Sequence, residues 1–161
     1  MQALIAFTSQ YLFVTVILLE ALYLLVFQNR RWKALLAATL VIGVLAFLIS
    51  LVANRLIQDP RPFVEDGFTP VISSSRDNGF PSDHVILLAT TAAITTVANP
   101  IAGFLGFLGA VIVGLARVYV GVHHLLDVIG SLAIVAFASG VYVGVIRLWR
   151  LSRSRLGRRG K

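Results

Sequence analysis

Five long apolar runs, separated by short polar segments, limit more than any other feature how this chain can fold. Charged residues make up 13% of the 161 residues, whereas a soluble domain carries about 25%, so most of the exterior must contact lipid. A helix that crosses a bilayer needs about 20 apolar residues. The sequence therefore predicts an all-α, polytopic membrane bundle with five transmembrane helices, at residues 4–27, 34–57, 82–99, 101–119 and 125–149.

The positions of the basic residues predict the orientation of this bundle. Seven of the 14 Lys and Arg residues lie from position 147 onward, and three more lie at positions 30–33. Basic segments beside membrane helices stay in the cytoplasm, which predicts a cytoplasmic C-terminus and, with five crossings, an N-terminus outside. The net charge of +7 therefore indicates topology and not nucleic-acid binding. We expect a membrane domain at residues 1–149 and a basic cytoplasmic tail at residues 150–161.

Polar side chains gather at two junctions, residues 54–83 and 117–127, which this topology places together at the outer face of the cell membrane. Arg117, His123 and Asp127 lie in the second junction. Residues four apart share a helix face, so Asp127 can accept from one ring nitrogen of His123 and leave the other free as nucleophile or base. The planar guanidinium of Arg117 suits phosphate oxygens. The alternative, polar side chains that merely reach the interface, is weak for three residues together.

The first junction contains two further candidate segments. Pro81-Ser82-Asp83-His84 begins the third apolar run, and these residue types are common at helix N-termini. A helix N-terminus also attracts phosphate, and His84 could donate a proton to a leaving oxygen, so both capping and catalysis stay open. Arg61, taken alone, favours an interfacial anchor.

Together these segments resemble the type 2 phosphatidic acid phosphatase family, which also includes vanadium haloperoxidases. The family pattern is a Lys, six residues and Arg-Pro, then Pro-Ser-Gly-His, then Ser-Arg, five residues, His, three residues and Asp. Here Arg61-Pro62 matches the first motif, residues 81–84 nearly match the second, and Arg117, His123 and Asp127 match the third in order and spacing.

Three positions depart from the family pattern. Asn54 stands in place of the Lys, Asp83 in place of the Gly, and Ala116 in place of the Ser. The first departure removes a phosphate-binding cation, and we expect Arg55 or Arg76 to replace it.

A narrower resemblance points to a substrate. Phe80 before Pro-Ser-Asp-His, and Arg-Pro-Phe at residues 61–63, are similar to the bacitracin-resistance type of undecaprenyl pyrophosphate phosphatase. This implies a lipid phosphatase that converts undecaprenyl pyrophosphate to undecaprenyl phosphate. Phosphatidic acid, phosphatidylglycerol phosphate or another lipid phosphate is the alternative substrate.

The resemblance also implies roles for these residues. His123 would attack phosphorus and form a phosphohistidine, Asp127 would orient it, and His84 would protonate the leaving oxygen. His124, only three residues before Asp127, is not expected to be the nucleophile. No metal or other cofactor is expected, because arginines and backbone dipoles can neutralise the phosphate charge; the chain also contains no cysteine ligand. The expected phosphate-binding residues are Arg61, Ser82, Arg117, Asp83 and Arg55.

Glu20 is the one charged residue deep within an apolar run. Intramembrane acids are costly and face the bundle interior, so they are candidates for function or for hydrogen-bonded packing; neither is assigned here. A small membrane transporter, the non-enzyme alternative, would carry more polar residues at midplane depth. Glycine residues on the last two runs predict close helix contacts.

Overall fold

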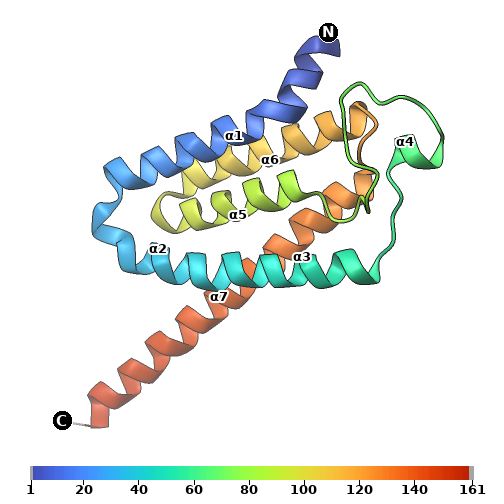
Figure 1. Ribbon diagram of the computed structural model, residues 1–161. Helices are drawn as coiled ribbons and strands as arrows, with labels where there is room; N and C mark the ends of the chain where they lie inside the picture. Colours follow the sequence, from blue (N-terminus) through green and yellow to red (C-terminus); the bar gives the residue numbers. More distant parts are fainter. Residues whose placement is uncertain (1, 160–161) are drawn as a thin grey trace.

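The computed structural model, which describes residues 2–159, consists of helices and connecting loops and contains no strand within those residues (Figure 1). Four helices are long and apolar enough to cross a membrane, and α5 is shorter at 16 residues. The predicted all-α membrane bundle is thus confirmed. The helices are α1 (Gln2–Phe27), α2 (Trp32–Ala38), α3 (Val44–Leu56), α4 (Pro62–Glu65), α5 (Asp83–Ala98), α6 (Pro100–Tyr119) and α7 (Leu125–Arg159).

The helix boundaries follow the residues that disfavour or cap helices. A π-helical turn, Thr39–Gly43, joins α2 to α3, so Trp32–Leu56 forms one span. Pro100 occupies the first turn of α6, where a missing N–H costs nothing, and the Asn99 side chain accepts from the amides of Ile101 and Ala102. α7 passes position 150 without interruption, so the boundary expected there is not a break in secondary structure.

Helix α5 lies between α6 and the span formed by α2 and α3 (Figure 1). Its contact with α6 is close because α6 carries glycines: a Cβ at Gly103 would lie 2.7 Å from the Thr96 backbone. On α7, by contrast, a Cβ at Gly140 or Gly144 would meet nothing within 4 Å. Glu20 of α1 is buried beside Gly106, so it faces the bundle interior as expected.

The two polar junctions meet at one end of the bundle, which we call the polar end: residues 57–82 and 120–124 (Figure 1). The amide of Val71 donates to the carbonyl of Val120, at 3.3 Å, and Phe63 and Ile72 pack with Val120 in a small apolar cluster. Gly121, at φ 79°, lies under the Phe68 ring. The loop between α3 and α5 therefore folds over the junction between α6 and α7.

Candidate active site

His123 lies at the centre of the polar end, just before α7, and its side chain is 2% exposed. Its Nδ1 lies 3.1 Å from Oδ2 of Asp127, one helical turn later. The carboxylate holds Nδ1 as the protonated nitrogen, so Nε2 keeps its lone pair. Burial lowers the pKa of His123, and the charges of Arg117 and Arg61 lower it further against the opposing effect of Asp127. The imidazole is therefore held neutral and oriented.

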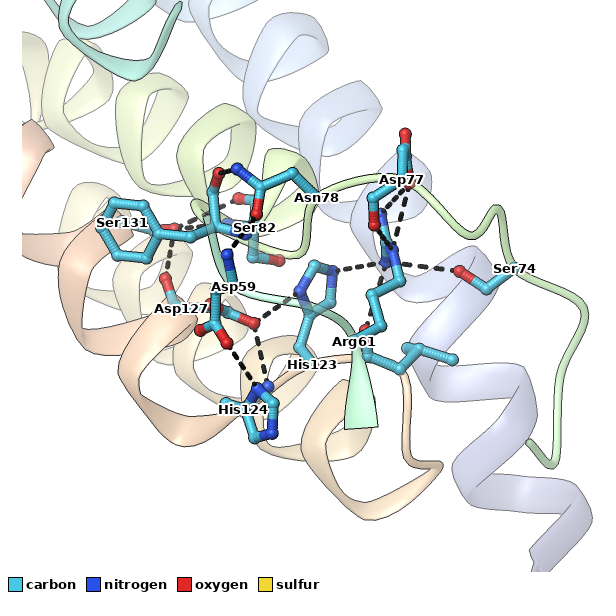
Figure 2. Close-up of polar contacts among 12 residues, drawn as sticks. Asp59, Arg61, Ser74, Asp77, Asn78, Ser82, His123, His124, Asp127 and Ser131 are labelled. Atoms are coloured by element: carbon cyan, nitrogen blue, oxygen red, sulfur yellow. Dashed lines mark hydrogen bonds and ion pairs between the residues drawn. The ribbon is translucent and has the colours of Figure 1, made fainter. Parts of the chain in front are cut away.

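Arg61 comes from the other junction and contacts the free nitrogen of this ring. Its Nη1 lies 3.4 Å from Nε2 of His123 and donates to the carbonyl of Val122 at 3.2 Å. Nε and Nη2 donate to Oδ1 of Asp77, at 3.1 and 2.9 Å (Figure 2). Hydrogen bonds from Ser75 and from Arg61 keep the pKa of Asp77 low. The Arg61 guanidinium is thus fixed by contacts on several of its donors.

His84, in the first turn of α5, lies beside Arg117 near the end of α6. Arg117 Nη1 lies 3.3 Å from Nε2 of His84 and donates to the backbone carbonyl of Ser9, at 3.2 Å. The Phe13 ring meets His84 edge to face, with centroids 4.2 Å apart. Helix α1 therefore supports the second histidine as well as the second arginine.

A cavity of about 420 Å³ joins these two groups of residues. Five residues singled out in the sequence line it: Arg61, Asp83, His84, Arg117 and His123. Two guanidinium groups around one cavity can bind an anion, and the histidine nitrogens beside them have the chemistry of a nucleophile or a proton donor.

Three of the expected site residues lie away from the cavity wall. Asp127 is fully buried behind His123. Ser82 is also fully buried, and its backbone amide donates to Oγ of Ser131 at 2.9 Å. Arg55 is exposed at the end of α3 and does not line the cavity, and neither does Arg76.

Comparison with known families agrees with this geometry, since a model of the PAP2 superfamily matches residues 32–151. The chain belongs to the PAP2 superfamily. This membership assigns it to the phosphoric ester hydrolases. Helix α1 lies outside the matched residues.

Several curated proteins are similar to this PAP2 chain. It is 26% identical to the undecaprenyl-diphosphatase BcrC of Bacillus subtilis, over 83% of this chain and 69% of that protein. It is 34% identical to an undecaprenyl-diphosphatase of Sulfolobus acidocaldarius, over 67% of this chain and 52% of that protein. The putative undecaprenyl-diphosphatase YbjG of Escherichia coli is 29% identical, over 74% of this chain and 61% of that protein.

One solved structure has the same fold. The first transmembrane PAP2 type phosphatidylglycerolphosphate phosphatase from Bacillus subtilis superposes with a TM-score of 0.62 at 24% sequence identity. The match covers 91% of this chain and 75% of that one. At this identity the likeness establishes the shared fold.

Asn54, where the family pattern has Lys, organises the loop of this PAP2 chain. Its Nδ2 donates to the carbonyl of Phe80 at 2.8 Å, and its own carbonyl accepts from Nδ2 of Asn78 at 2.7 Å. Asn78 also donates to the carbonyl of Ile57 at 2.7 Å. The position that would hold a cation instead anchors the segment that precedes α5.

Several residues at this PAP2 site could not be predicted from the sequence. Gln10, Tyr11, Ser74 and Asp77 line the cavity from α1 and from the loop before α5. They belong to no motif, and only the folded chain brings them there.

A second group of residues could not be predicted either, because one member is far from the other two in the sequence. Asp59, His124 and Asp127 place ligand-type atoms within 4.8 Å of one another. The spacing of residues along the chain had suggested no such cluster. Ligand atoms this close to one another can bind a cation, or the carboxyl groups of Asp59 and Asp127 can share a proton.

Proposed function

We propose that this chain removes the outer phosphate from undecaprenyl pyrophosphate, at the outer face of the cell membrane, through a phosphohistidine on His123. One observation carries the proposal: Asp127 holds Nδ1 of His123, while Nε2 faces Arg61 at a cavity that His84 and Arg117 also line. The names of the relatives support the choice of lipid.

The first chemical step uses both histidines. The Nε2 lone pair of His123 attacks the outer phosphorus, and the bond from phosphorus to the bridging oxygen breaks. His84, which holds a proton when the anionic substrate is bound, gives it to that leaving oxygen, so undecaprenyl phosphate departs as a monoanion and not as the less stable dianion. Arg61 and Arg117 stabilise the charge that gathers on the transferring phosphoryl oxygens.

The second step restores the protein. Water attacks the phosphorus of the phosphohistidine, and the electron pair of the P–N bond returns to Nε2 of His123. His84, now neutral, takes the proton that the water loses. Inorganic phosphate leaves, and both histidines have their starting protonation. Asp127 stabilises the positive charge on the imidazole while the phosphate is attached.

Phosphate release by the purified protein in detergent tests the proposal. The substrates are undecaprenyl pyrophosphate, phosphatidic acid, phosphatidylglycerol phosphate and diacylglycerol pyrophosphate, each with and without EDTA. We expect the first substrate to give the highest kcat/KM and EDTA to have no effect. Preference for another lipid would correct the substrate, whereas activity that needs magnesium would refute the metal-free mechanism.

The orientation can be tested separately, because the chain contains no cysteine. Pro70→Cys places a single thiol in the loop of the polar end. A membrane-impermeant maleimide should label it in intact cells. Labelling only after permeabilisation would place the polar end, and with it the reaction, on the cytoplasmic side.

A further inference from the structure

Asp127, which holds the proposed nucleophile, has one carboxylate oxygen that the mechanism leaves unexplained. Oδ2 is 3.1 Å from Nδ1 of His123 and accepts from the amide of His124 at 2.9 Å. Oδ1 is buried and has no hydrogen-bond partner within the described residues. A buried carboxylate oxygen without a donor is strongly unfavourable, so a donor is expected beside it.

The group that faces Asp127 is another carboxyl, that of Asp59. Figure 2 shows the two carboxyl groups side by side, and they lie within the 4.8 Å cluster formed with His124. Gly79 packs against both residues: a Cβ there would lie 3.2 Å from Oδ2 of Asp127 and 3.1 Å from the Asp59 carbonyl. Two carboxylates this close do not both ionise readily, and sharing one proton removes the repulsion.

We infer that Asp59 is a positioning residue for the proposed nucleophile: its neutral carboxyl group donates a hydrogen bond to Oδ1 of Asp127. Asp127 then carries one negative charge, with donors from three residues around it. This fixes the carboxylate plane and, through Oδ2, the ring of His123. The inference rests on the proposed function, because it explains how the phosphate acceptor is held.

His124 has a place in the same arrangement. Its Nδ1 lies 3.1 Å from Oδ1 of Asp59, and its Nε2 lies 3.6 Å from Oε2 of Glu65. Side-chain exposure rises from 0% at Asp127 to 25% at Asp59, 34% at His124 and 60% at Glu65. His124 thus lies against the outer side of Asp59, while the inner side faces Asp127.

The charges around Asp59 favour its neutral form. Burial raises its pKa, and the inferred hydrogen bond to Asp127 and the charges of Asp127 and Glu65 raise it further, whereas His124 acts in the opposite direction. A raised carboxyl pKa means that the proton stays on the group to a higher pH than on an exposed Asp. When the pH passes that pKa, the pair gains a second negative charge and the donor to Oδ1 is lost.

Two substitutions at position 59 test the inference, once the wild-type protein has been shown to be active. In Asp59→Asn the amide has the same shape and still donates to Asp127, so kcat should stay within about threefold of wild type. In Asp59→Ala the donor is gone, and kcat should fall about 10- to 100-fold with KM little changed, as expected for a buried acceptor left unsatisfied. Asp66→Asn, the same substitution outside the cluster, should match wild type.

The pH dependence of kcat provides a readout that a purely structural role would not change. Wild-type activity should decline at alkaline pH as Asp59 ionises, and Asp59→Asn should lack that decline because an amide does not titrate. This comparison needs only the wild type and the Asn variant, so it holds even where the Ala variant fails to fold.

Loss of activity in Asp59→Asn as large as in Asp59→Ala would overturn the inference, because a negatively charged Asp59 would then be required. Restoration of activity by a divalent cation in EDTA-treated wild type, but not in Asp59→Asn, would likewise show that the cluster holds a cation. The first outcome leaves the proposed function untouched, whereas the second would also refute its metal-free mechanism. That function fails instead where the wild type releases no phosphate from any of the lipids.

Discussion

The two halves of the site differ in how completely their arginines are bonded. Arg61 uses its guanidinium nitrogens on Asp77, Ser74 and the carbonyl of Val122. Arg117 has one nitrogen, Nη1, on the Ser9 carbonyl and beside His84, and its buried Nε has no partner within the described chain. The half around the proposed nucleophile is therefore bonded before substrate arrives, whereas in the half around the proposed acid fewer guanidinium donors are bonded.

Removing the proposed nucleophile should cause the largest loss of kcat. His123→Ala deletes the covalent route, so kcat should fall by about 1,000-fold or more. His124→Ala is the matched control, and we expect a loss of about tenfold through displacement of its neighbours. Turnover of undecaprenyl pyrophosphate measures both losses, and size-exclusion chromatography checks that both variants are folded. Equal losses at the two histidines would mean that the nucleophile is misassigned.

Replacing the acid should cost less and should depend on the substrate. His84→Gln should lower kcat for the lipid about 100-fold, because general acid catalysis contributes at that scale. With p-nitrophenyl phosphate, whose leaving group needs no proton, the loss should nearly vanish. His123→Ala should show no such recovery. If both variants lose the same factor on both substrates, His84 does not protonate the leaving oxygen.

A smaller change should follow from freeing Arg61 of its acidic partner. Asp77 is 68% exposed at its side chain and lies 2.9 Å from Arg61, so a substrate phosphate must share the guanidinium with a carboxylate. Asp77→Asn keeps the shape and removes that charge, and KM should fall about two- to fivefold at low salt. The difference should shrink in 0.5 M NaCl. A raised KM would show instead that Asp77 is needed to hold Arg61 in place.

The smallest effects are expected at the two arginines that the sequence suggested as replacements for the family lysine. Arg55 and Arg76 are both exposed and do not line the cavity. Arg55→Ala and Arg76→Ala should therefore each keep kcat/KM within about twofold of wild type, the scale of an exposed charge. A loss of tenfold in either variant would restore the replacement role.

The parts of the site that could be predicted are those set by local spacing. The pair His123 and Asp127 lies four residues apart next to a helix start, so the helix repeat itself brings the side chains together. The contact of Arg61 with His123 joins two junctions, and only the family motifs linked them in advance. Asp59 and Asp77 could not be found, because they lie in an irregular loop whose path depends on Asn54, Asn78 and Gly79.

The fold shows the same division between local and long-range information. Hydropathy located all five apolar segments, and the fourth, expected at residues 101–119, is α6 at Pro100–Tyr119. The order of the helices around α5 depends on side-chain fit along whole helix faces. Gly103 and Gly106 allow close contacts, whereas Gly140 and Gly144 meet nothing within 4 Å, and residue type alone does not distinguish these two pairs.

The contact between Arg117 and Ser9 has a consequence for mutational scanning. The acceptor is a backbone carbonyl, at 3.2 Å, so every substitution at position 9 that preserves the helix leaves it in place. An alanine scan of α1 would detect the loss of the Phe13 ring. It would not detect the contact between the Ser9 carbonyl and Arg117. Inserting one residue between positions 9 and 13 would rotate the preceding turn by about 100° and withdraw the carbonyl from Arg117. The position of Arg117 therefore depends on the register of α1 more than on the side chains of α1.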